Sequence, residues 1–171
     1  MILAYLLSSF ILLVSSLVQA AILSNMTFLP AVPDLCLICV LYFSRHNGKL
    51  FGETNGFISG IFLDFLSAGP LGLNWLMRTI IGYVSGIFNK TINTEGFFVP
   101  VLLGACATVL KVLITWILSF LFPNSIIAYN PFTVLFVFEI AINSFLTPII
   151  FKILGPFQQN IGFKTGECSV T

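Results

Sequence analysis

Charged residues are scarce in this chain. Lysine and arginine together number 7, aspartate and glutamate number 6, and 58% of the 171 residues are hydrophobic. A soluble domain of this length needs many more charged residues to cover its surface, so the composition excludes a soluble globular domain. The formal net charge of +1 gives no support to a protein that binds nucleic acid or another polyanion. We therefore expect an integral membrane protein, whose surroundings are the lipid bilayer.

Residues that bind metals or activate nucleophiles are also scarce. The chain has one histidine, His46, and 4 cysteines. Cys36 and Cys39 form a C-x-x-C motif inside an apolar helical run with no second pair nearby, so we interpret them as small buried hydrophobic residues. We find no Ser/His/Asp set, no phosphate-binding loop and no pair of acids at matching depth. The sequence therefore predicts no catalytic residue, no metal site, no cofactor and no enzymatic activity.

Long apolar runs make up most of the chain. A membrane-spanning helix needs about 20 apolar residues, and on this basis we predict an all-α, polytopic membrane protein with six transmembrane helices in one domain. The predicted spans cover residues 2–23, 30–44, 51–67, 71–88, 97–122 and 132–154. The second run is short, so it is either a tilted span or a re-entrant helix that would leave five spans. We favour six.

The predicted loops alternate in charge. One set holds Arg45, Lys49, Lys90, Lys152 and Lys164, and the other set has no lysine or arginine. The positive-inside rule places the first set, together with the C-terminus, in the cytoplasm. Six spans would place the N-terminus in the cytoplasm as well, whereas five spans would place it outside.

Glycine recurs at four-residue intervals in the third and fourth predicted spans. The third span contains Gly52, Gly56 and Gly60, and the fourth contains Gly82 and Gly86. Residues four apart share one face of a helix, and small residues there let a neighbouring backbone approach closely. We predict that these glycines form a helix-packing face. Packing within a tight hairpin is favoured over dimerisation or partner binding, because the neighbouring helix is tethered.

Four charged residues fall inside predicted spans: Asp64, Arg78, Lys111 and Glu139. A rise of about 1.5 Å per residue places all four in the outer half of the bilayer, with Asp64 within reach of Arg78 across the hairpin. Two acids and two bases at this depth indicate a neutral buried cluster. The cluster either fixes helix packing through ion pairs or lines an outward-facing pocket for a polar ligand or partner segment. We favour the structural role.

Several short motifs follow one another between Pro33 and Gly86. They are Pro33-Asp34 with Leu37-Ile38 and Leu41-Tyr42, then Gly52, Gly56-Phe57, Gly60, Asp64 and Ser67, then Leu71-Gly72. Their order and spacing resemble the family of rod-shape-determining membrane proteins, MreD. Length, short loops and the number of predicted spans agree with this resemblance over essentially the whole chain.

The resemblance implies a multi-pass scaffold of the bacterial cell-elongation machinery, which builds peptidoglycan, in the inner (cytoplasmic) membrane. Family members work with the single-span protein MreC and, through it, with MreB filaments, the transglycosylase RodA and a class B penicillin-binding protein.

The family fold is similar to the six-helix substrate-binding S components of energy-coupling-factor transporters, so an S component for a vitamin or another small molecule is the alternative function. S components commonly dock through an Ala-x-x-x-Ala face on the first helix. This chain has only Ala4-x-x-x-Ser8 there, which counts against the alternative.

Overall fold

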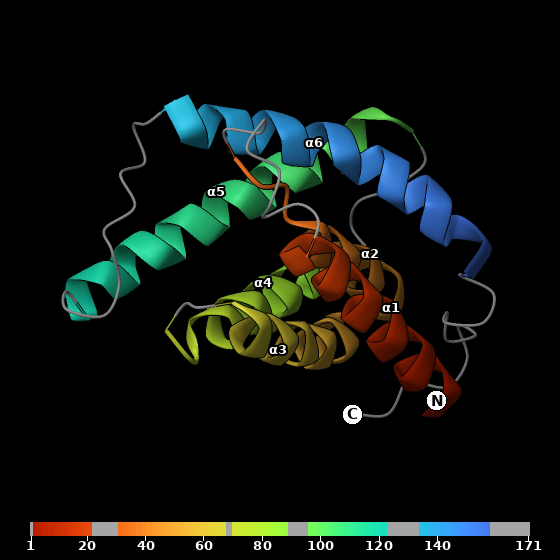
Figure 1. Cartoon of the computed structure of the whole chain (residues 1–171). Helices are drawn as coiled ribbons and strands as arrows, with labels where there is room; N and C mark the ends of the chain where they lie inside the picture. The colour runs from red at the N-terminus through yellow and green to blue at the C-terminus, as the bar shows by residue number, and fades with distance from the viewer. Residues whose placement is uncertain (1, 22–30, 68–69, 89–95, 123–133, 158–171) are drawn as a thin grey trace.

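The computed structural model describes residues 2–21, 31–67, 70–88, 96–122 and 134–157 (Figure 1). Within these ranges all regular secondary structure is helical and there is no strand, as the long apolar runs predict. The helices are α1 (Ile2–Ala21), α2 (Leu35–Asn47), α3 (Lys49–Leu66), α4 (Leu73–Ile87), α5 (Phe98–Leu121) and α6 (Val134–Leu154), and a 3-10 turn, η2 (Gly155–Phe157), follows α6.

The helices divide into two groups by length and polarity. Three are long and apolar enough to cross a membrane: α1, α5, and α6 together with η2. Of the other three, α2 has 13 residues and α4 has 15. α3 has 18 residues but carries Lys49, Glu53 and Asp64. Six helices are thus present in the described part of the chain, whereas six membrane spans remain a prediction.

Most helix ends lie within three residues of the predicted span ends, and α2 differs most. It begins at Leu35 rather than at residue 30 and ends at Asn47 rather than at residue 44.

Asp34 sets the start of α2, because its side chain accepts a hydrogen bond from the Leu37 backbone N–H at 3.1 Å. Gly48 sets the end with a φ of 91°, a conformation that glycine adopts without strain. The predicted spans leave residues 45–50 as a loop, and this is wrong, since only Gly48 separates α2 from α3. Predicted ends at residues 22–23, 30 and 132–133 lie outside the described ranges.

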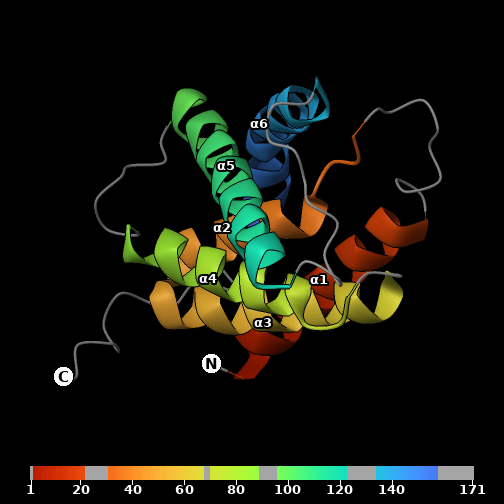
Figure 2. The same ribbon diagram turned by 90° about the vertical axis from the view of Figure 1, so that its left-hand side faces the viewer.

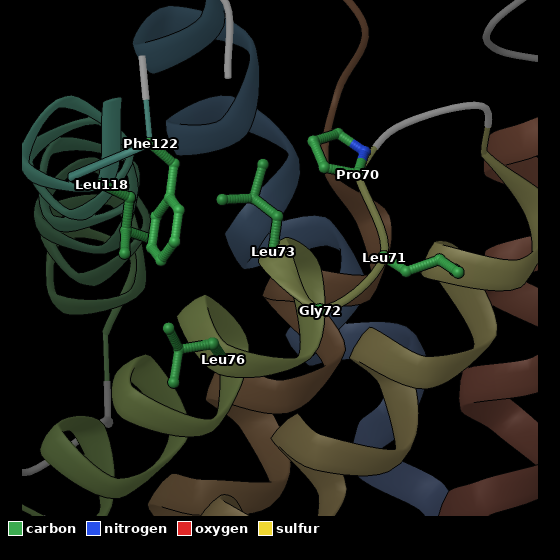
Figure 3. A pocket seen from close by; sticks show the side chains of 7 residues that line it. All are labelled: Pro70, Leu71, Gly72, Leu73, Leu76, Leu118 and Phe122. Carbon is green, nitrogen blue, oxygen red and sulfur yellow. The ribbon is translucent and has the colours of Figure 1, made fainter. Parts of the chain in front are cut away.

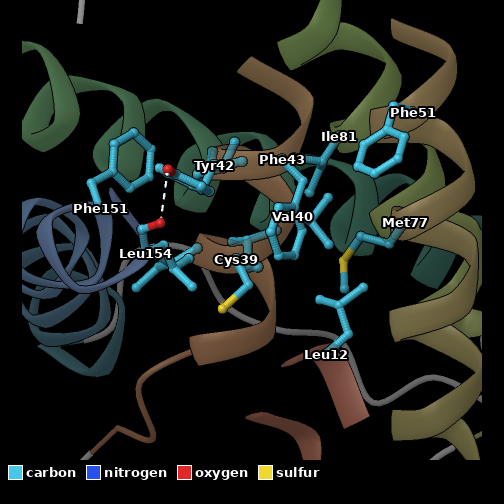
Figure 4. Close-up of a cluster of buried hydrophobic side chains, with 14 of the residues drawn as sticks. Leu12, Cys39, Val40, Tyr42, Phe43, Phe51, Met77, Ile81, Phe151 and Leu154 are labelled. Atoms are coloured by element: carbon cyan, nitrogen blue, oxygen red, sulfur yellow. Dashed lines mark hydrogen bonds between the residues drawn. The ribbon is translucent and has the colours of Figure 1, made fainter. Parts of the chain in front are cut away.

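α2 lies at the centre of the molecule. It contacts α1, α3, α4, α5 and α6, and all its residues from Cys36 to Arg45 are buried. Figure 4 shows its side chains in a core that also includes residues of the surrounding helices: Leu12, Phe51, Met77, Ile81, Phe151 and Leu154. A helix that is apolar on all sides has to be enclosed by protein or lipid, and here the other five helices enclose it.

α5 and α6 form a pair that lies across the rest of the bundle. Figure 2 shows α3 and α4 side by side, with α5 crossing α4 steeply. A glycine brings α5 and α6 together, because a Cβ atom added at Gly104 would lie only 3.1 Å from the Cβ of Thr147. α6 continues as a helix through Pro148. Its last turn is tied to α2, since the hydroxyl of Tyr42 donates to the carbonyl of Leu154 at 3.1 Å (Figure 4).

Candidate functional site

A buried ionic network joins four helices at the N-terminus of α2. The Asp34 carboxylate accepts a hydrogen bond from the guanidinium of Arg78 in α4, and its second oxygen lies 3.0 Å from Nζ of Lys111 in α5. Lys111 also donates to Oε1 of Glu139 in α6 at 2.7 Å. We call Asp34, Arg78, Lys111 and Glu139 the Asp34 network.

Neutral side chains extend the network between α5 and α6. The Asn143 side-chain oxygen accepts a hydrogen bond from the Asp34 backbone N–H at 2.9 Å. The Asn143 amide donates to the hydroxyl of Thr108 at 3.1 Å, and Thr108 donates to the carbonyl of Gly104 at 2.8 Å. Asn143 therefore connects the start of α2 to both helices of the α5–α6 pair.

The Asp34 network is formally neutral and almost closed to solvent. Two carboxylates balance two cations, and the side chains of Asp34 and Arg78 are only 2% and 1% exposed. Lys111 is the most accessible member, with 22% of its side chain exposed. Isolated charges at such depth would be strongly unfavourable, so mutual pairing is what allows them inside an apolar bundle. The network is therefore suited to fixing the positions of α2, α4, α5 and α6.

The expected pairing of Asp64 with Arg78 is wrong. No ion pair joins these two residues among those described, because Arg78 is turned toward Asp34. Asp64 instead caps α4. It accepts hydrogen bonds from the backbone N–H groups of Gly72 at 2.9 Å, Asn74 at 3.1 Å and Trp75 at 3.4 Å, and from the Asn74 side chain at 2.9 Å. Unpaired N–H groups at a helix start favour a carboxylate, so Asp64 needs no cation.

The sequence contained a signal for Asp34 that our cluster prediction did not use. Asp34 entered our prediction only through the Pro33-Asp34 motif, and in the structure it caps the start of α2. Asp34 directly precedes the apolar run from Leu35 to Phe43, and a helix start packed inside the bundle buries this carboxylate with it. A buried carboxylate needs a cation at Asp34 as much as at Glu139.

The five glycines predicted to form a packing face lie where α3 and α4 approach each other. A Cβ atom added at Gly52 would lie 2.5 Å from the carbonyl oxygen of Gly82, and one added at Gly82 would lie 2.7 Å from the carbonyl carbon of Gly52. Side chains at Gly56, Gly60 and Gly86 would likewise collide with the backbones of Arg78, Trp75 and Lys49. The two backbones are therefore too close for any side chain larger than hydrogen at these positions.

An apolar pocket of about 320 Å³ lies beside the start of α4 and the end of α5 (Figure 3). Its lining has no charged side chain and consists of Pro70, Leu71, Gly72, Leu73, Leu76, Leu118 and Phe122. Such a lining suits an apolar group rather than a polar ligand. The pocket does not include any member of the Asp34 network.

Other sequence predictions concern thiols and metals. Cys36 and Cys39 are buried in α2, and their thiols hydrogen-bond with the Leu12 carbonyl and the Ser15 hydroxyl. In the described part of the chain, no group of three or more His, Cys, Asp or Glu side chains could hold a metal ion.

These features agree with the comparison to known protein families. The family described as rod shape-determining protein MreD matches residues 1–156 of the chain. The chain belongs to the MreD family. It is therefore a rod-shape-determining membrane protein, and the match includes every helix described above. Comparisons with curated proteins and with solved structures gave no match, so the likeness to transporter S components remains a prediction.

Proposed function

We propose that this chain is a non-enzymatic scaffold of the bacterial cell-elongation machinery in the inner membrane. It would bind MreC, and through MreC or directly the proteins RodA, MreB and a class B penicillin-binding protein. Binding would use helix faces within the bilayer, because the links between helices that the structure describes are too short to form a separate binding domain. Family membership supports the cellular role.

The observation that carries the proposed mechanism is where the polar and apolar groups lie. Four buried charged side chains interact with other parts of the same chain: Asp34, Asp64, Arg78 and Glu139. The outward faces of the long helices are apolar instead, and their most exposed residues include Leu6 and Phe10 in α1, Leu102 and Phe120 in α5, and Val137 and Phe145 in α6. Such faces can pack against lipid or against the transmembrane helix of a partner.

The proposed topology follows from charge. With six spans, both termini and the α2–α3 junction at Gly48 lie on the cytoplasmic side, and the α3–α4 turn lies outside. The start of α4 and the pocket beside it then lie at the outer membrane boundary. This arrangement gives a partner such as MreC access to the outer helix ends as well as to the helix faces.

A transporter S component is supported less well. Its docking would require the Ala4-x-x-x-Ser8 face of α1 to be available to another protein. Ala4 is 6% exposed and Ser8 is fully buried, in a helix that packs against α2 and α3. This face is therefore occupied within the chain.

Co-purification separates the two functions. The tagged chain should be expressed at its natural level, extracted in a mild detergent and analysed with its bound proteins by mass spectrometry. The scaffold function predicts recovery of MreC and other elongation proteins. A pair of ATPases in place of those proteins would support the transporter subunit and contradict the scaffold.

A further inference from the structure

A wedge between α4 and α5 produces the apolar pocket shown in Figure 3. The two helices cross steeply (Figure 2) and touch where the hydroxyl of Thr115 donates to the sulfur of Met77 at 3.4 Å. Away from a crossing point the axes of two helices diverge, and side chains on them no longer interdigitate. Leu76 and Leu118 lie to one side of this contact and form two walls of a space of about 320 Å³.

Buried polar contacts hold both walls of the pocket in place. On the α4 side, Asp64 accepts a hydrogen bond from the backbone N–H of Gly72 at 2.9 Å. On the α5 side, Lys111 is bound to Asp34, which also binds Arg78 in α4. A movement of α5 onto the start of α4 would disturb these buried ion pairs, which is costly. The pocket is therefore a preformed feature of the bundle.

The lining of the pocket has little to offer a polar ligand. Every lining residue is glycine or has an apolar side chain. The backbone N–H of Gly72 is used by Asp64, and those of Leu73, Leu76 and Phe122 donate to carbonyls of the same chain. A water molecule or a lipid headgroup would lose hydrogen bonds on entry, and cavities with such a lining stay dry and bind apolar molecules. The chemistry of the lining therefore selects an apolar occupant.

The pocket opens on an apolar surface of a membrane protein. Two of its lining residues, Leu71 and Phe122, are 75% and 54% exposed. The helix that carries Leu118, α5, is long and apolar enough to cross the membrane, and the family match shows a membrane protein. An unfilled space would deprive its walls of van der Waals contacts. Acyl chains surround such a surface on all sides, so the bilayer supplies an apolar occupant before any protein partner binds.

From this geometry we propose that the pocket between α4 and α5 binds one acyl chain of a phospholipid. The chain packs against Leu73, Leu76 and Leu118, and the headgroup stays outside because no lining side chain can bind it. Binding therefore depends on the volume of the pocket and not on the charge of the headgroup. This inference goes beyond the scaffold function, since it requires a membrane-spanning α5 but no MreC.

Photolabelling locates the bound chain. The protein would be reconstituted with a phosphatidylcholine that carries a diazirine on one acyl chain, extracted in a mild detergent, freed of unbound lipid and irradiated. We expect the label on Leu73, Leu76 and Leu118, because a lipid held in the pocket survives the extraction. Label spread evenly over exposed residues outside the pocket, such as Leu102 and Leu113, would overturn the proposal. Absence of label from the lining would also overturn it, because another protein segment would then fill the pocket.

Matched variants test whether pocket volume is the cause. Leu118→Phe fills part of the pocket, whereas Leu118→Ala enlarges it. Exclusion of about two methylene groups should lower the lipid affinity of Leu118→Phe, measured from the labelling of Leu73 and Leu76, about tenfold. Leu118→Ala should retain the lipid.

Leu113→Phe is the control, because it makes the same change on the same helix at a residue that is 49% exposed and outside the lining. Its labelling should equal that of the unmodified protein. Unchanged labelling in Leu118→Phe, or an equal loss in Leu118→Phe and Leu118→Ala, would contradict the proposal. These experiments contain no MreC, so failure here is distinguishable from failure of the co-purification.

Discussion

Asp34 pairs with Arg78 although 44 positions separate them in the sequence. The pair joins the first turn of the enclosed helix α2 to the middle of α4, and Lys111 extends it to α5. Because Asp34 also caps α2, one carboxylate holds a helix start and two cations in place. We therefore expect the bundle to depend more on Asp34 than on any other charged residue.

Removal of the Asp34 charge should destabilise the protein. Asp34→Asn can still cap α2 but cannot balance Arg78 and Lys111, and an uncompensated buried charge costs about 3–5 kcal/mol. Asp34→Ala should lose about 1 kcal/mol more, because the cap is removed as well. Thermal unfolding of the purified protein in detergent measures both differences.

A double-mutant cycle tests the pairing itself. Asp34→Asn combined with Arg78→Met should be less destabilising than the sum of the two single changes, with a coupling of about 1–3 kcal/mol. Additive effects would show that the two side chains do not interact. The cycle of Asp64→Asn with Arg78→Met is the matched control, and it should be additive.

Asp34 and Asp64 show how much of the charged contacts could be predicted from the sequence. The partner predicted for Asp64, Arg78, was wrong, and no partner was predicted for Asp34, because reach along a hairpin does not show which way a long arginine side chain turns. Arg78 turns toward α2, a direction that depends on where α2 lies in three dimensions. Asp64 is satisfied by backbone N–H groups at a turn, and a charge count alone cannot detect such partners.

Loss of the Asp64 carboxylate should loosen the start of α4. Asp64→Ala removes hydrogen bonds to Gly72, Asn74 and Trp75, and hydrogen bonds to charged groups contribute about 1.5–3 kcal/mol. Asp64→Asn keeps one acceptor oxygen and should be milder. Hydrogen exchange of the α4 amides is the measurement, and unchanged protection in Asp64→Ala would contradict the cap.

Larger side chains on the glycine face should force α3 and α4 apart. Gly56→Leu and Gly60→Leu place atoms inside the backbones of Arg78 and Trp75, and overpacking of this kind costs about 1–3 kcal/mol or more. Phe65→Leu is the control, because Phe65 is 78% exposed. Thermal stability and the amount of protein in the membrane give the result, and equal tolerance at all three positions would remove the close-packing argument.

Cysteine labelling tests the membrane topology. In a background with Cys106 and Cys168 replaced by serine, a reagent that cannot cross the membrane should reach Ser67→Cys from outside but not Lys49→Cys. Both positions are exposed, whereas Asn93 and Asn124, the loop sites suggested by charge alone, lie outside the described residues. Ile2→Cys should be protected with six spans and labelled from outside with five.

The six helices were predictable from hydrophobic runs and turn residues because these signals are local. The central position of α2 was not, although the apolarity of its residues from Leu35 to Phe43 fits an enclosed helix. Periodicity shows which face of a helix is apolar, but this stretch has no polar face, so the pattern does not predict which helices surround it. The steep crossing of α5 over α4 also depends on contacts between distant residues.

The central claim is that exposed helix faces bind the partner within the membrane. Photo-crosslinking in cells tests it most directly, with a benzophenone amino acid at Phe10 in α1, Phe120 in α5 or Phe145 in α6, which are 64–70% exposed. Phe43, which is fully buried in α2, is the control. The account predicts a crosslink to the transmembrane segment of MreC from at least one exposed position and none from Phe43. Crosslinks to ATPase subunits instead, or no protein crosslink from any of the three helix faces, would contradict it.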